Sequence, residues 1–270
     1  MRDFTLYALS RIILELQEAR FEFVSISDYF EKSESGWPAV ILRHDVDRRL
    51  DRSLRMAEME SGMGIRGTYY FRAREGRFPD KAIREISALG HEIGYHYEDL
   101  RVAKGNLAAA LESFEKNLAS LREIASIKTI CMHGSPLSKY DNRDMWRTRS
   151  YRDFGIIGEP YFDVDFDKVM YLTDTGRRWD GESVSIRDKA DKDRKSITEG
   201  SRAENRLRLN STRDIINALK NNQLPDQIML TIHPQRWTDE WVPWLWELVS
   251  QKTKNIVKSI IVKRINNKKA

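Results

Sequence analysis

The stretch "AVILRHDVDRRLDRSL", residues 39–54, decides the fold and points to the chemistry. Its first half is an apolar run with the length of a buried strand, and its second half has leucines at helical spacing. Between the two halves stand His44, Asp45 and Asp47. A buried strand that leads directly into a helix is typical of a parallel α/β sheet. Two carboxylates at the end of such a strand therefore indicate either a helix cap or a functional site.

The same alternation continues along the chain. Strand-like segments separated by helices or long connections occur at 21–26, 67–71, 91–96, 128–133, 168–174 and 227–233, and further short strand character lies near "GIIG", residues 155–158. This order predicts an α/β fold, a single-domain (β/α)7-type distorted barrel with parallel strands. An open doubly wound sheet is the alternative, but no glycine-rich phosphate loop follows any strand.

No internal repeat and no low-complexity linker divides the sequence, so we expect one domain over residues 1–270. An N-terminal helix at about 1–22 and a basic C-terminal helix at about 239–265 are expected to pack on it. "PDKAIREISALG", residues 79–90, predicts a helix with proline at its start and glycine at its end. Ser211 and Asp214 predict a capping box.

Composition narrows the function classes. With 40% hydrophobic and 32% charged residues, the chain is that of a folded protein with a well-solvated surface. The net charge of +5 is modest and gathers in residues 252–270, which contain no acid. That tail lacks interleaved aromatics, so we expect no nucleic-acid partner, whereas a peripheral membrane contact through it stays open. A single cysteine and the lack of a secretory signal or membrane span predict a cytoplasmic protein.

Ionisable side chains stand at the ends of four predicted strands. They are Asp45 and Asp47, His96, His133 and His233. In a parallel barrel all strand C-termini lie on one face, where active sites form. His91 is excluded from a shared site with His96, because five residues of strand span roughly 16 Å.

Two of these features have structural alternatives. Asp45 and Asp47 would project to one face roughly 7 Å apart, but either could instead cap the following helix. Cys131 and His133 share a face and suggest a Cys-His nucleophile, yet the thiol is expected one layer deeper, buried and inert.

In these residues the chain resembles the polysaccharide deacetylase family, the carbohydrate esterase family 4-like proteins with a NodB-homology domain. The likeness runs from about residue 40 to 234 and rests on "LRHDVD", "GHEIGYH" and "MLTIHP". It implies that Asp45 is the general base, Asp47 and His96 are metal ligands, and His233 is the general acid.

The chain also departs from the family pattern. Leu100 stands where the resemblance implies a second metal-binding histidine, and the arginine–proline motif after the fourth strand is replaced by "MHGSPLSKYDN". We expect His133 to supply the missing ligand. Glu98 or Asp99 in the loop are the alternatives, and a protein that binds no metal is a third reading.

The resemblance implies a metal-dependent hydrolase that removes an N-acetyl or O-acetyl group from a carbohydrate, either an acetylated sugar or a glycan precursor. The expected cofactor is a divalent ion, zinc first, with cobalt, nickel, manganese or iron as alternatives. Two arginines and two tryptophans in loops near the rim are candidates for substrate binding: Arg178, Trp179, Arg236 and Trp237. The tryptophans could equally cover the core. A catalytically silent glycan-binding barrel is the competing function, and an adaptor built on the basic tail is the third.

Overall fold

Residues 39–46 form the central strand β2, Ala39–Val46, and every residue of it is buried. The computed structural model describes residues 2–32, 37–134, 138–179 and 207–253. On one side of β2 lies β7, Gln227–Ile232, in parallel register. On the other side β1, Glu22–Val24, pairs with the first half of β2 and β3, Thr68–Phe71, pairs with the second half. The apolar run is therefore the buried central strand that the sequence predicts.

The remaining strands extend the sheet in both directions. They are β4, Glu92–Tyr97, β5, Ile127–Met132, and β6, Met170–Thr173. The strand order is β5-β4-β3-β2-β7-β6, with β1 beside β2, and these strands pair in parallel throughout the described part of the chain. This confirms the predicted (β/α)7-type distorted barrel with parallel strands, whose path begins at β5 and ends at β6.

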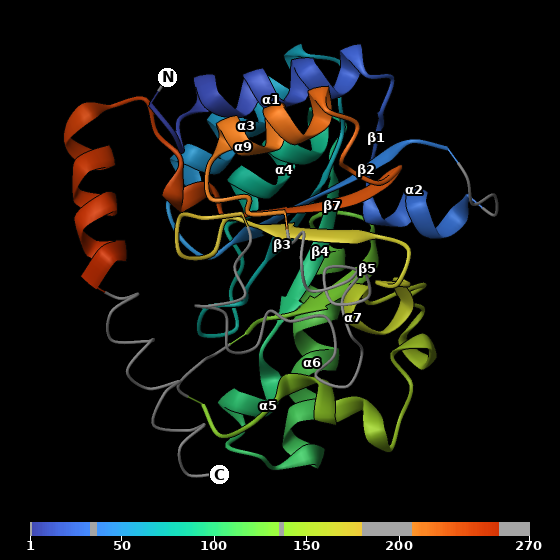
Figure 1. The fold of residues 1–270 in the computed structure, drawn as a ribbon. Helices are drawn as coiled ribbons and strands as arrows, with labels where there is room; N and C mark the ends of the chain where they lie inside the picture. Colours follow the sequence, from blue (N-terminus) through green and yellow to red (C-terminus); the bar gives the residue numbers. More distant parts are fainter. Residues whose placement is uncertain (1, 33–36, 135–137, 180–206, 254–270) are drawn as a thin grey trace, which may run out of the picture.

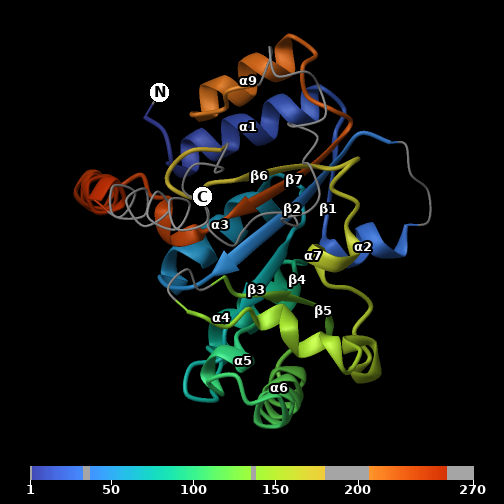
Figure 2. The ribbon, with the colours of Figure 1, turned by 60° about the horizontal axis from the view of Figure 1, so that its bottom comes forward.

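Helices surround the sheet (Figures 1 and 2). The described α-helices are α1 (Leu6–Glu18), α2 (Ile26–Glu31), α3 (Leu50–Gly62), α4 (Asp80–Ala88), α5 (Asp99–Val102), α6 (Leu107–Arg122), α7 (Pro160–Asp163) and α9 (Thr212–Lys220). Short 3-10 helices are η1 (Asn142–Arg147), η2 (Tyr151–Phe154) and η3 (Pro234–Arg236). Helix α1 packs on α9 beside β6 and β7, and α6 packs on β4 and β5.

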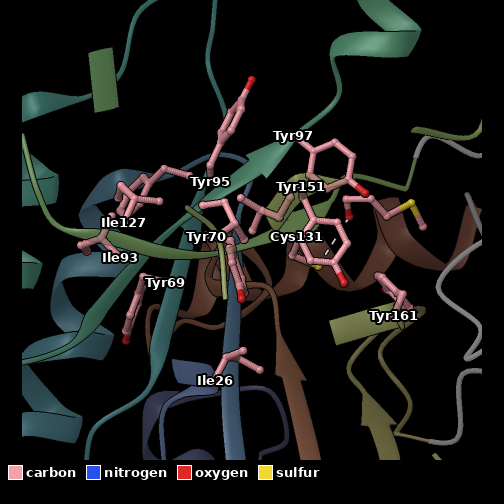
Figure 3. Close-up of a cluster of buried hydrophobic side chains, with 14 of the residues drawn as sticks. Ile26, Tyr69, Tyr70, Ile93, Tyr95, Tyr97, Ile127, Cys131, Tyr151 and Tyr161 are labelled. Atoms are coloured by element: carbon pink, nitrogen blue, oxygen red, sulfur yellow. Dashed lines mark hydrogen bonds between the residues drawn. The ribbon is translucent and has the colours of Figure 1, made fainter. Parts of the chain in front are cut away.

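Alternation along β2 divides the apolar core into two parts. Val40 and Leu42 belong to a cluster with residues of α1 and α9, whereas Ile41 belongs to a second cluster, which also contains residues of α4 and α6. Figure 3 shows buried aromatic side chains of the second cluster, among them Tyr70 and Tyr97. Arg43 and Asp45 share the inward parity of Ile41, so the same alternation delivers charged groups to the mouth of the barrel.

Glycine at position 94 makes room for one of these rings. A Cβ atom there would lie 2.2 Å from Cε1 of Tyr70, a distance that no real contact allows. The Tyr70 hydroxyl reaches across and forms a 2.9 Å hydrogen bond with Oγ1 of Thr129 on β5. This buried contact ties β3 to β5 beneath the rim.

Several local predictions can be compared with the observed elements. The capping box of Ser211 and Asp214 at α9 is confirmed, and α4 begins directly after Pro79. The segment near "GIIG" forms only an isolated bridge between Gly158 and Thr129, so the short strand predicted there is wrong. The C-terminal helix is found at 241–253, while the predicted remainder to 265 lies outside the described residues.

Candidate metal centre and catalytic residues

Five strands deliver ionisable side chains to one rim of the sheet. Asp45 belongs to β2 and His96 to β4, and the residues that directly follow β5, β6 and β7 are His133, Asp174 and His233. Because all these strands are parallel, their C-terminal ends lie at one end of the sheet. The structure therefore brings together the acids and imidazoles predicted for the rim and adds Asp174 to them.

Asp47, His96 and His133 form a set of potential metal ligands. One ligand atom from each lies within 4.8 Å of the others. Nε2 of His133 lies 3.4 Å from Oδ1 of Asp47. Two ligands of a tetrahedral zinc ion, each about 2.1 Å from it, lie roughly 3.4 Å apart, so the spacing of these donors fits a divalent ion.

Both histidines are oriented by a contact at the second ring nitrogen. Nδ1 of His96 is 2.9 Å from the carbonyl oxygen of Cys131, and Nδ1 of His133 is 3.2 Å from Oε2 of Glu98. A proton on Nδ1 of His96 would point to that carbonyl oxygen and leave the Nε2 lone pair free toward Asp47, whereas Nδ1 of His133 lies beside the Glu98 carboxylate without a hydrogen bond to it. Oxygen partners of this kind typically orient metal-binding histidines.

The alternative third ligands have other roles. Glu98 also accepts a 3.1 Å hydrogen bond from Nε of Arg72. Asp99 accepts hydrogen bonds from the Tyr95 hydroxyl at 2.7 Å and from Ser113, so its carboxylate is engaged beside α6. The donor set thus favours His133 over both acids.

The pKa values of the two histidines are shifted in opposite directions. Burial lowers the pKa of His96 to about 4, so its ring is neutral at pH 7. Burial also acts to lower the pKa of His133, but the neighbouring Asp47 and Glu98 carboxylates outweigh it and raise this pKa to about 9. Without an ion, His133 is therefore an imidazolium between two carboxylates.

Asp47 is held as a carboxylate by its neighbours. It accepts hydrogen bonds from Nη1 of Arg72 and from Nε2 of Gln235, each at 3.2 Å. Burial acts to raise its pKa, yet the hydrogen bond and charge of His133 hold it well below the usual range. Neither Asp45 nor Asp47 caps α3, because Arg49 occupies the N-cap position and makes no side-chain capping bond.

Asp45 is paired with an arginine from its own strand. Nε and Nη2 of Arg43 donate to the two carboxylate oxygens of Asp45 at 2.9 and 2.7 Å, and both side chains are buried. Although burial acts to raise the pKa of Asp45, the charge of Arg43 and its hydrogen bonds lower it. Asp45 is therefore ionised, and its Oδ2 lies 3.7 Å from Nε2 of His96.

His233 faces Asp45 and is held from behind by Asp174. Nε2 of His233 lies 4.0 Å from Oδ2 of Asp45, whereas Nδ1 lies 2.7 Å from Oδ1 of Asp174. Asp174 also accepts hydrogen bonds from the backbone N–H of His233 at 2.8 Å and from Nε1 of Trp237 at 2.7 Å. Burial acts to raise the pKa of Asp174, but the charges of Arg236 and His233 lower it to about 2.

The residues predicted to bind substrate occupy other places. Trp179 and Trp237 are fully buried, and their ring centroids lie 5.7 Å apart. Neither indole offers an open face to a sugar ring, so the stacking role expected of them is wrong. Phe4 packs against both rings, a contact that the local sequence does not reveal. Arg236 donates a hydrogen bond to Asp174. Arg178 donates a hydrogen bond to Oδ1 of Asn210.

Several residues of the site are not identified from the sequence, among them Asp174, Arg43, Arg72 and Gln235. Asp174 follows the strand "MYLT" and could have been found by the same strand-end rule that located the histidines. Arg43 shares the parity of Asp45 two residues away, and an arginine inside an apolar run is itself a signal. His44, with the opposite parity, points out of the barrel to Glu60 on α3, 2.8 Å from its Nε2.

No family model and no curated protein sequence matches this chain. Solved structures similar to it are family 4 carbohydrate esterases at low identity. A CE4 family pseudoenzyme from Bacillus anthracis is 12% identical at a TM-score of 0.40, over 82% of this chain and 62% of that one, so this chain spans less than two thirds of that protein.

Two further structures show the same level of similarity. The Xyl-CE4 domain of a multidomain xylanase from the hindgut metagenome of Trinervitermes trinervoides is 9% identical at a TM-score of 0.39, over 86% and 85% of the two chains. A family 4 carbohydrate esterase from Streptomyces lividans, in complex with acetate, is 13% identical at 0.37, over 83% and 90%. Within the described residues, no helix is long and apolar enough to cross a bilayer.

Proposed function

We propose that this protein is a metal-dependent hydrolase that removes an acetyl group, N-linked or O-linked, from a carbohydrate. The observation that carries the proposal is the juxtaposition at one rim of two sets of groups. An acid–histidine–histidine donor set, Asp47, His96 and His133, adjoins an acid–histidine pair, Asp45 and His233, whose polar atoms lie 4.0 Å apart. Hydrolysis of an amide or ester needs an electrophile, a base and an acid in this proximity.

Asp47, His96 and His133 would hold the ion, zinc in the first instance and otherwise cobalt, nickel, manganese or iron. When bound, such an ion supplies Lewis-acid chemistry and lowers the pKa of a water ligand from about 15.7 towards 7. Arg72 and Gln235 keep the Asp47 carboxylate in place through hydrogen bonds of 3.2 Å. The donor set and its orienting partners thus fit a divalent cation.

Asp45 takes the role of general base. It is ionised at neutral pH and lies beside the donor set, 3.7 Å from Nε2 of His96. It would accept a proton from the water that attacks the acetyl carbonyl carbon. Arg43 fixes the carboxylate plane and stabilises the ionised form, so the base is available before substrate arrives.

His233 takes the role of general acid. Asp174 holds Nδ1 at 2.7 Å, which leaves Nε2 toward Asp45 and the space above the rim. Nε2 would donate its proton to the departing amine or alcohol as the bond between carbonyl carbon and leaving group breaks. The products are acetate and a sugar with a free amino or hydroxyl group. The substrate class is part of the proposal and rests on the resemblance of the sequence motifs. A cytoplasmic site of action is also part of the proposal and rests on the single cysteine.

Metal content tests the proposal first. We expect purified protein and the surface control Glu112→Ala to carry about one divalent ion per chain, and Asp47→Ala and His96→Ala to lose most of it. Elemental analysis after dialysis provides the measurement. If neither substitution lowers the metal content, the hydrolase proposal is wrong. Acetate release from N-acetyl sugars, nucleotide sugars and short glycans then tests the reaction.

One observation favours the competing function, a silent barrel that binds glycan without cutting it. Both oxygens of Asp45 accept hydrogen bonds from Arg43, a partner that makes a carboxylate a weaker base. The two functions differ in one result. Glycan binding by metal-loaded protein without acetate release from any acetylated ligand would establish the silent barrel.

A further inference from the structure

The C-terminal helix at residues 241–253 is apolar on two adjacent faces. One face is turned to the body, where Trp244 and Leu248 are partly buried and Gln251 is buried. Nε1 of Trp244 donates a 2.7 Å hydrogen bond to the carbonyl oxygen of Asp3, which fixes the helix on the N-terminal segment. In Figure 1 this helix stands at the edge of the molecule, with only one side against other elements.

The second face is exposed. It consists of large apolar side chains at the spacing of one helical stripe: Trp241, Val242, Leu245, Trp246 and Val249. Trp241 is 71% exposed and Trp246 is 73% exposed. A helix that is apolar on both faces is normally buried on both, so the exposed stripe indicates a partner for this face.

The basic charge near the end of the helix favours an anionic partner for its exposed face. Acids occur only at the start and in the middle of this segment, at Asp239, Glu240 and Glu247. The helix end and the sequence after it contain only basic charges, at Lys252, Lys254, Lys258, Lys263, Arg264, Lys268 and Lys269. On the N-terminal side the guanidinium of Arg2 lies 4.0 Å from the centroid of the Trp241 ring. Cations of one sign repel a second copy of the same surface, whereas they are attracted to anionic lipid headgroups.

We propose that the exposed face of helix 241–253 docks on an anionic lipid surface. Tryptophan prefers the interface between headgroups and acyl chains, and an amphipathic helix with basic flanks lies in that plane. The helix begins shortly after His233 and η3, and it lies on the side toward which β2 and β7 point (Figure 2). Docking would therefore hold the rim that carries Asp45 and His233 next to the bilayer.

Vesicle flotation of the full chain tests this. We expect binding to phosphatidylcholine vesicles that contain about 30% phosphatidylglycerol, about tenfold weaker binding to pure phosphatidylcholine, and loss of binding in high salt. The double variant Leu245→Ser, Trp246→Ser should bind at least about tenfold more weakly than the wild type. The matched control Val102→Ser, an exposed apolar residue on α5, should bind like the wild type.

Three results would each overturn the proposal. The first is a full chain that does not float with anionic vesicles. The second is a double variant, folded by circular dichroism, that floats as well as the wild type. The third is a dimer in sedimentation that the double variant converts to monomer, because the face would then be covered by a second copy. A blue shift of tryptophan fluorescence on adding anionic vesicles, absent in the double variant, would support docking.

Discussion

Nε2 of His133 lies 3.4 Å from Oδ1 of Asp47, while its Nδ1 lies 3.2 Å from Oε2 of Glu98. One imidazole thus spans two carboxylates that belong to different loops. In the absence of an ion the doubly protonated ring places a positive charge between the two carboxylates, which is why the pKa of His133 rises to about 9. The same ring nitrogen that would bind a cation is then protonated, so the proton and the cation compete for one position.

This competition predicts that metal affinity rises with pH. Between pH 7 and about 9, His133 must lose its proton on binding, whereas His96, with a pKa of about 4, has none to lose. We expect the apparent affinity for zinc to increase up to about tenfold per pH unit, with release of about one proton per ion. Calorimetry in buffers of different ionisation enthalpy measures the release. Proton release that is unchanged in His133→Asn would contradict the assignment.

The same group predicts a pH dependence of stability in the metal-free protein. The folded-state pKa of His133, about 9, exceeds the unfolded value of about 6.5, so the contribution is fully present below about pH 6.5 and is lost as pH rises through about 9. Its size is about 3 kcal/mol at most. Urea denaturation of chelated protein at pH 6 and pH 9 measures it. A wild type that loses no more stability over this range than His133→Asn would contradict the prediction.

Arg43 is predicted to set the acidity of the base. Arg43→Lys keeps the charge but replaces two parallel hydrogen bonds with a single point contact, so the pKa of Asp45 should rise. The low-pH limb of the kcat/KM profile for acetate release should then move to higher pH. Arg43→Met leaves a buried carboxylate unpaired and should cost about 3–5 kcal/mol of unfolding free energy. A pH profile of Arg43→Lys that coincides with the wild type would refute this role.

Much of the fold and part of the candidate site could be predicted from local sequence. The strand ends at Asp45, His96 and His233 could be predicted because parity and strand termination are local properties, and parallel pairing then brings them to one rim. Trp179 and Trp237 were misplaced because their burial depends on Phe4, a residue far away in the chain. The bidentate pair of Arg43 and Asp45, and the bridge that Arg72 makes between Asp47 and Glu98, depend on side-chain orientations that no residue pattern specifies.

Asp174 is predicted to act on the reaction through His233. It holds Nδ1 at 2.7 Å and is itself fixed by the backbone N–H of His233 and by Nε1 of Trp237. Asp174→Asn keeps the shape but removes the charge that stabilises a protonated His233, so kcat for acetate release should fall by about 100-fold or more with little change in KM. Trp237→Phe removes one hydrogen bond to Asp174 and should have a smaller effect of the same kind.

The matched control for this prediction is Asp163→Asn, which replaces an aspartate that accepts a hydrogen bond from the Tyr151 hydroxyl at 2.7 Å, away from the rim. It should leave kcat near the wild-type value. Because a loss of folding would also lower kcat, the metal content and the melting temperature of each variant are measured. The kcat values are compared only for variants that match the wild type in both. Wild-type kcat in Asp174→Asn would show that His233 needs no carboxylate, and a general-acid role for His233 held by Asp174 would have to be abandoned.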